Sequence, residues 1–214
     1  MRTIKHHLTE PLLIAYSAGT LPEAFSLVVA THISMCDDCR AQSESLDAVG
    51  GAMLDKCGTA SLSDDAFAET LALIAGQHEE QRAPVHPAGV FPAPLQEYVG
   101  GDLDNVKWRG LGGGVRQAIL KTSRDATVRL LRIPAGMAMP DHGHKGTEMT
   151  LVLKGAFRDE HDRFGRGDVE IADEHIEHTP VAEEGEDCIC LAASDGRMRF
   201  NAFIPRIAQP FLRI

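Results

Sequence analysis

The chain has 214 residues, of which 43% are hydrophobic and 24% are charged, an ordinary globular composition that excludes a disordered or fibrous protein. Its 31 acidic residues outnumber 21 basic ones, giving a formal net charge of −10, so direct binding to nucleic acid or to an anionic membrane is not expected. No apolar run approaches the roughly 18 residues that span a bilayer, and the first residues lack the apolar stretch of a signal peptide, so we expect a cytoplasmic protein.

The first 76 residues have helical periodicity. Capping and helix-breaking residues predict helices from Thr9 to Gly19, from Pro22 through His32, from Asp37 or Asp38 to about Gly50-Gly51, and from Ser63 to Gly76. A bundle of this length has a thin core and benefits from a cross-link that holds its helices together.

Residues 77–94 contain four of the eleven prolines and no apolar periodicity, which predicts a linker. From residue 95 onward, short apolar segments alternate with Pro, Gly and Asp clusters, a pattern typical of a β-sandwich or barrel. The expected strands are 126–133, 149–153, 168–172, 187–193 and 199–203, with a hairpin at Gly112-Gly113-Gly114. The fold class is therefore a multi-domain α and β protein, with a four-helix domain at 1–76, a linker at 77–94 and a β-barrel domain at 95–214.

A histidine and two cysteines form the first candidate site. The segment His32-Ile-Ser-Met-Cys36-Asp-Asp-Cys39 places three nitrogen and sulfur ligands within about two helical turns. An odd number of cysteines in a reducing compartment favours thiolate ligands over disulfides. Zinc accepts such ligands tetrahedrally, and His6 or His7 can supply the fourth. A redox pair is the simpler alternative for Cys36 and Cys39.

His7, then 24 intervening residues, then His32-x3-Cys36-x2-Cys39 form a pattern that resembles the zinc-binding anti-sigma factor family. The resemblance implies that His7, His32, Cys36 and Cys39 bind zinc. It also implies that residues 1–76 are an anti-sigma domain that holds an extracytoplasmic-function sigma factor away from RNA polymerase. The acidic balance of these residues, ten Asp or Glu against four Lys or Arg, suits a basic, DNA-binding partner.

Three histidines and a glutamate form the second candidate site. In Gly136-x5-His142-Gly-His144-x3-Glu148-x6-Gly155, the two histidines share one side of a strand, and Glu148 follows within reach. A third imidazole comes from His178 or from His175. Imidazole and carboxylate ligands together suit zinc, manganese, iron or nickel.

This second pattern resembles the two motifs of the cupin barrel, which implies His142, His144, Glu148 and His178 as ligands. The second cupin motif is altered, since Asp173, His175 and Ala182 stand where cupins usually have Pro, Gly and Asn. Joined to an anti-sigma domain, the barrel resembles the C-terminal half of the ChrR type. That resemblance implies a regulator that releases its sigma factor in response to oxidants such as singlet oxygen.

Cys188 and Cys190 face one side of a predicted apolar strand, either as small core residues or as thiols that take part in oxidant sensing. The leading hypothesis is a transcriptional regulator that is not an enzyme. One alternative is a metal-dependent cupin oxygenase or isomerase with a helical regulatory domain. Another is a redox switch in which Cys36 and Cys39 form a disulfide as zinc leaves.

Overall fold

A computed structural model of the chain describes residues 3–76, 89–174, 177–196 and 198–200, and for residues 142, 144 and 198–200 it describes the backbone alone. The helices predicted for the first 76 residues are all present, which confirms that part of the fold prediction. They are α1 (Glu10–Ser17), α2 (Glu23–Ile33), α3 (Asp37–Leu54) and α4 (Ala66–Gly76). Gly19, with a φ of +66°, ends the first helical segment as expected.

Helix α5 (Ala93–Val99) was not predicted and begins inside the segment assigned to the linker. Its prolines misled the sequence analysis, because Pro92 is the N-cap and Pro94 lies in the first turn, where a helix needs no proline N–H. A 3-10 helix (Leu103–Asn105) follows. Residues 77–88 of the predicted linker lie outside the described residues.

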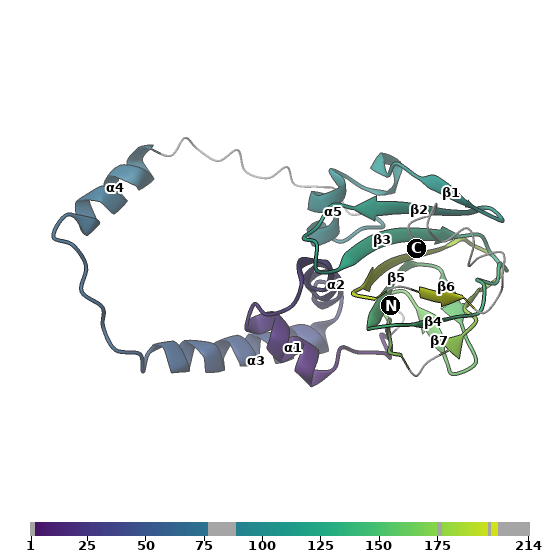
Figure 1. The fold of residues 1–214 in the computed structure, drawn as a ribbon, viewed down its shortest axis with the longest axis horizontal. Helices are drawn as coiled ribbons and strands as arrows, with labels where there is room; N and C mark the ends of the chain where they lie inside the picture. Colours follow the sequence, from purple (N-terminus) through teal and green to yellow (C-terminus); the bar gives the residue numbers. More distant parts are fainter. Residues whose placement is uncertain (1–2, 77–88, 175–176, 197, 201–214) are drawn as a thin grey trace.

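Antiparallel strands build the C-terminal half (Figure 1). A six-stranded sheet has the order β1-β2-β3-β11-β5-β8, and two three-stranded sheets, β10-β6-β7 and β12-β4-β9, complete the barrel. The strands are β1 (Arg109–Gly112), β2 (Val115–Leu120), β3 (Thr127–Ile133), β4 (His142–His144), β5 (Glu148–Lys154), β6 (Ala156–Arg158), β7 (Arg163–Gly165), β8 (Val169–Ala172), β9 (Glu177–His178), β10 (Val181–Ala182), β11 (Cys188–Ser194) and β12 (Met198–Phe200). The predicted strands and the glycine hairpin are present as far as residue 200; residues 201–203 of the last one lie outside the described residues.

The central strands of the six-stranded sheet are buried on both faces, which explains their continuous apolar sequences. Val152 and Cys190 point into the barrel and pack with Phe157 and Phe164 from the opposite side. Their neighbours Leu151 and Leu191 point outward into a second, larger core. The barrel is therefore covered on one outer face.

Helix α2 supplies that cover (Figure 1). It contacts β3, β5 and β11, and its residues Phe25, Leu27 and Val28 are buried in the same cluster as the outward-facing strand residues. The N-terminal helices were expected to have a thin core of their own. Instead, α1 and α2 share one apolar core with the sheet, which gives the short helices the burial that a 76-residue unit lacks.

Helix α4 is not part of this shared core. It contains no buried residue, and Phe67, Leu71 and Ile74, which share one face of the helix, remain exposed. Figure 1 shows α4 apart from the other helices and from the barrel. In the part of the chain that the structure describes, α4 therefore adds nothing to the core shared by α1, α2 and the sheet. Among the described residues, no helix is long and apolar enough to cross a membrane.

The shared core predicts that truncating α2 destabilises the barrel together with the helices. Leu27→Ala should lower the free energy of unfolding by about 2–5 kcal/mol in one cooperative transition, because it removes buried methyl groups. Leu54→Ala, at a leucine that is 72% exposed, should change it by less than about 0.5 kcal/mol. Urea denaturation followed by circular dichroism and by Trp108 fluorescence measures both variants. Separate transitions for the two signals in the Leu27 variant would contradict a shared core.

Candidate metal centres

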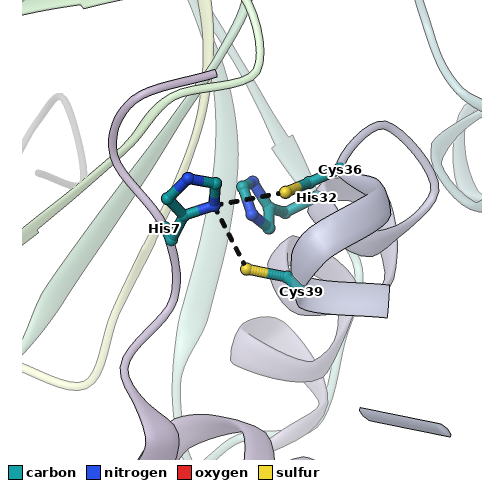
Figure 2. A group of neighbouring side chains, drawn as sticks. All are labelled: His7, His32, Cys36 and Cys39. Atoms are coloured by element: carbon teal, nitrogen blue, oxygen red, sulfur yellow. Dashed lines mark hydrogen bonds between the residues drawn. The ribbon is translucent and has the colours of Figure 1, made fainter. Parts of the chain in front are cut away.

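The four residues of the first candidate site come together from three segments (Figure 2). His7 lies in the extended segment before α1, His32 in the last turn of α2, Cys36 at the N-cap of α3 and Cys39 in its first turn. One ligand atom from each lies within 4.8 Å of the other three. A short turn between Ile33 and Asp37 separates α2 from α3, close to the predicted helix boundaries, and the Cys36 N–H donates to the His32 carbonyl at 2.9 Å.

His32 is held in the tautomer that metal binding needs. Its ring is fully buried, and its Nδ1 lies 2.9 Å from the carbonyl oxygen of Gly167, which can only accept a hydrogen bond. The proton is therefore on Nδ1, and Nε2 carries a lone pair that has no hydrogen-bond partner in the described structure. Burial lowers the pKa of His32 to about 4, so the ring is neutral at physiological pH. A buried lone pair of this kind fits a metal ligand.

His7 faces both thiols (Figure 2). Its Nδ1 lies 3.3 Å from the Cys36 sulfur and 3.6 Å from the Cys39 sulfur. Burial raises the pKa of Cys39 to about 11, so without a nearby cation this thiol keeps its proton. A divalent cation would favour both thiolates, and two nitrogens with two sulfurs form a tetrahedral donor set suited to zinc. The residues present fit a structural zinc ion.

His6 lies elsewhere, although the sequence left it as an alternative to its neighbour. Its Nε2 is 3.0 Å from Asp162 Oδ2, and its ring centroid lies 4.4 Å from that of Phe164. His6 therefore contacts the barrel, while His7 faces the cysteines.

The second candidate site lies at one end of the barrel. His142 on β4 is paired in register with His178 on β9, so their Cβ atoms share one face of the sheet. His144 shares that face by alternation, and Glu148 begins β5 and is buried. For His142 and His144 the structure describes only the backbone, and His175 lies outside the described residues. The register agrees with a common site for the predicted ligands.

Two carboxylates that the sequence analysis missed lie beside His178. Its Nδ1 is 2.8 Å from Glu170 Oε1 and 3.5 Å from Asp159 Oδ2. These residues, with His178, also form a group whose ligand atoms lie within 4.8 Å of one another. Burial acts to lower the pKa of His178, but the carboxylates of Glu170, Glu148 and Asp159 together outweigh it and raise that pKa. Glu170 lies in a strand that was predicted, and an acidic residue between apolar neighbours was the available signal.

A proton on His178 Nδ1, shared with Glu170, leaves Nε2 for a metal. This carboxylate–histidine arrangement is the usual outer-shell support of metal-binding imidazoles. Around it, Thr150 donates a hydrogen bond to Glu148 at 3.2 Å, and the positive charge of buried Arg129 interacts with Glu148. The described residues at this end of the barrel thus fit a divalent metal held by nitrogen and oxygen.

Cys188 and Cys190 lie inside the barrel among apolar side chains, with their sulfurs 3.5 Å apart, too far for a disulfide bond. The hydrogen bond with Cys188 and burial raise the pKa of Cys190 well above its usual range. Both residues therefore contribute to the core as thiols, and their role in oxidant sensing stays a prediction.

Comparisons with known proteins agree with this architecture. A family described as the ChrR cupin-like domain matches residues 96–196, which confirms the expected cupin barrel. The anti-sigma-E factor ChrR of Cereibacter sphaeroides is 59% identical over 213 residues, covering 99% of this chain and 100% of the relative. A crystal structure of Rhodobacter sphaeroides SigE in complex with the anti-sigma ChrR matches with a TM-score of 0.80 and 58% identity, covering 90% of this chain and 99% of that one. The chain therefore belongs to the ChrR family of anti-sigma factors, which are regulators and not enzymes.

Proposed function

We propose that the chain binds an extracytoplasmic-function sigma factor through its N-terminal helices and withholds it from RNA polymerase. The relative of known structure, ChrR, is in complex with SigE, and its chain corresponds to this one over 99% of its length. The observation in this chain that carries the proposal is a large apolar surface left without cover.

This α3–α4 apolar surface consists of side chains that are 49–81% exposed: Val49, Met53, Leu54, Leu62, Phe67, Leu71, Leu73 and Ile74. Large apolar side chains left exposed on two successive helices of a soluble protein indicate a site that a protein partner covers. A partner that covers both helices would bury the aliphatic and aromatic groups that the chain itself leaves in water. The residues around them are mainly acidic, with ten acidic against four basic residues in 1–76, which suits a basic partner that binds DNA.

We also propose that His7, His32, Cys36 and Cys39 hold a structural zinc ion. The neutral His32 ring with its free lone pair and the two facing thiols support this assignment. Zinc would supply the cross-link that joins the N-terminal segment, α2 and α3. The helices at 1–76 and the barrel at 95–214 would then be two functional parts of one cytoplasmic regulator, with neither part binding nucleic acid.

For the barrel we propose that His142, His144, Glu148 and His178 hold zinc or another divalent metal such as manganese, iron or nickel. The thiols inside the barrel are oxidisable, and a bound metal would hold the imidazoles in one fixed arrangement that oxidation of these side chains disturbs. An oxidant such as singlet oxygen would then alter these ligands, or the thiols of Cys188 and Cys190, and weaken the sigma complex. The paired register of His142 and His178 and the support of His178 by Glu170 favour this ligand set.

A charge introduced into the α3–α4 apolar surface should weaken binding to the sigma factor. Leu71→Asp places a carboxylate in the apolar face of α4 and should weaken binding to SigE at least about 30-fold, the size of an interface hot spot. Ile119→Asp, the same change at an exposed apolar residue of the barrel, should leave the affinity unchanged. Calorimetric titration measures both, and in vitro transcription should show inhibition lost with Leu71→Asp alone. Equal affinities of the two variants would exclude this surface.

Substitution of a cysteine inside the proposed zinc site should affect metal binding and stability, whereas substitution of a cysteine outside it should not. Cys39→Ser should weaken zinc binding by more than about 100-fold and lower the thermal stability of the helices. It removes a direct metal ligand, which contributes more to metal affinity than outer-shell groups do. Cys57→Ser, at an exposed cysteine outside the cluster, should change neither property. Atomic absorption and thermal scans give the readouts. Full zinc content in the Cys39 variant would remove Cys39 from the site.

The barrel site predicts that signal reception can be separated from sigma binding. Glu148→Gln should bind SigE with unchanged affinity but release it much more slowly than the unaltered chain when illuminated with a singlet-oxygen photosensitiser. The double variant Cys188→Ser, Cys190→Ser tests the thiols separately. Normal release by the Glu148 variant would place reception outside the metal site.

A further inference from the structure

One buried carboxylate of the barrel, that of Asp168, holds the backbone of the N-terminal segment that carries His7. Asp168 Oδ1 accepts hydrogen bonds from the N–H groups of Lys5 at 2.6 Å and His6 at 3.0 Å. Its other oxygen accepts from Gly165 N–H at 2.8 Å, within the β7–β8 turn. Asp168 is 5% exposed, so these bonds are shielded from water, and bonds to a charged acceptor are stronger than neutral ones.

Strand β8 extends this attachment. It is the edge strand of the six-stranded sheet, and Val169 at its start donates its N–H to the His6 carbonyl at 3.2 Å. The N-terminal segment thus covers part of the free edge of β8. His7 follows directly in the chain, so its position depends on this pairing.

The same turn holds a second candidate zinc ligand. The Gly167 carbonyl fixes the His32 ring through Nδ1 at 2.9 Å. Gly167 has a φ of +93°, and a Cβ there would lie 2.6 Å from Ile4 Cδ1, so the turn packs directly against the N-terminal segment. Both imidazoles of the first site are therefore oriented by residues 167–169 of the barrel, while both thiols belong to α3.

Strand β8 also contacts the second candidate site, through Glu170. Glu170, two residues after Asp168, accepts the hydrogen bond from His178 Nδ1 at 2.8 Å. One short stretch of backbone, from Gly167 to Glu170, therefore carries contacts to ligands of both sites. A shift of His178 that moves Glu170 must also act on the backbone that orients His7 and His32.

We propose that Gly167–Glu170 is the structural link between the two metal sites, in which Asp168 positions the zinc ligand His7 and Glu170 positions the barrel ligand His178. Disturbance of the barrel site is then transmitted to the N-terminal zinc site as weaker retention of its metal. This inference rests on the proposed function, because it takes both sites to be metal sites.

Cobalt(II) in place of zinc gives a readout confined to the first site, since only that site offers thiolate ligands and hence a sulfur-to-cobalt absorption band. Asp168→Asn in the full chain should speed the loss of this band after addition of a chelator by about 10-fold or more, the scale of outer-shell changes. The matched control is Asp187→Asn, at a barrel aspartate that pairs with Arg132. It should stay within about twofold of the unaltered chain.

Lys5→Pro tests the same bond from the other side. It removes the Lys5 N–H without altering the barrel, so it should also speed cobalt loss. If the Asp168 variant does not fold, Lys5→Pro alone tests the role of this hydrogen bond. Rates in both variants equal to that of Asp187→Asn would overturn the proposal. A chain without the band, by contrast, would overturn the zinc site of the proposed function.

A double-mutant cycle tests transmission from the barrel. His178→Ala, or His178→Gln where the first variant does not fold, should speed cobalt loss several-fold in the unaltered background, because His178 is the barrel residue that contacts Glu170 of the link. The same change should have little further effect in the Asp168→Asn background, because the link is already broken. Independent, multiplicative effects of the two changes, or no effect of the barrel change, would show that Asp168 does not carry the coupling.

Discussion

The packing of α2 on the outer face of the six-stranded sheet is the constraint on which the rest of the structure depends. It buries Val28 against strands that are already filled on their inner face, so that helix and barrel share one core. Because α2 ends at Ile33 over the β7–β8 turn, the same packing brings His32 to the Gly167 carbonyl. The geometry of the first metal site is therefore a consequence of how the helix docks.

Electrostatics distinguishes the two candidate metal sites. A fully buried, neutral imidazole with an unpaired nitrogen is costly in isolation, and burial disfavours the thiolate form of Cys39. A single cation satisfies both. At the barrel site the polar groups already satisfy one another, with Glu170 supporting His178 and Thr150 contacting Glu148. The first site is thus the one whose local structure depends most on a metal.

The sequence predicted those features that depend on residues close together in the chain. The spacing of His32, Cys36 and Cys39 identified the first cluster, and the alternation after residue 95 identified the strands. Contacts between distant residues could not be predicted: His32 and Gly167 are 135 residues apart, and no local pattern records that pairing. Helix α5 was missed because prolines mark both linkers and helix starts, and Glu170 because its inward direction depends on strand register.

The direction of α3 connects the metal site with the exposed apolar surface. Cys36 and Cys39 lie at the start of this 18-residue helix, whereas Val49 and Met53 lie near its end. At 1.5 Å per residue the helix is about 27 Å long, so a tilt of about 10° at its first turn moves its far end by about 5 Å. Such a displacement exceeds what a packed interface tolerates, since a gap of about 1 Å already removes up to about half of the attraction between apolar groups. A small change in geometry at the proposed zinc site would therefore be sufficient to disrupt a complex formed at the other end of the helix.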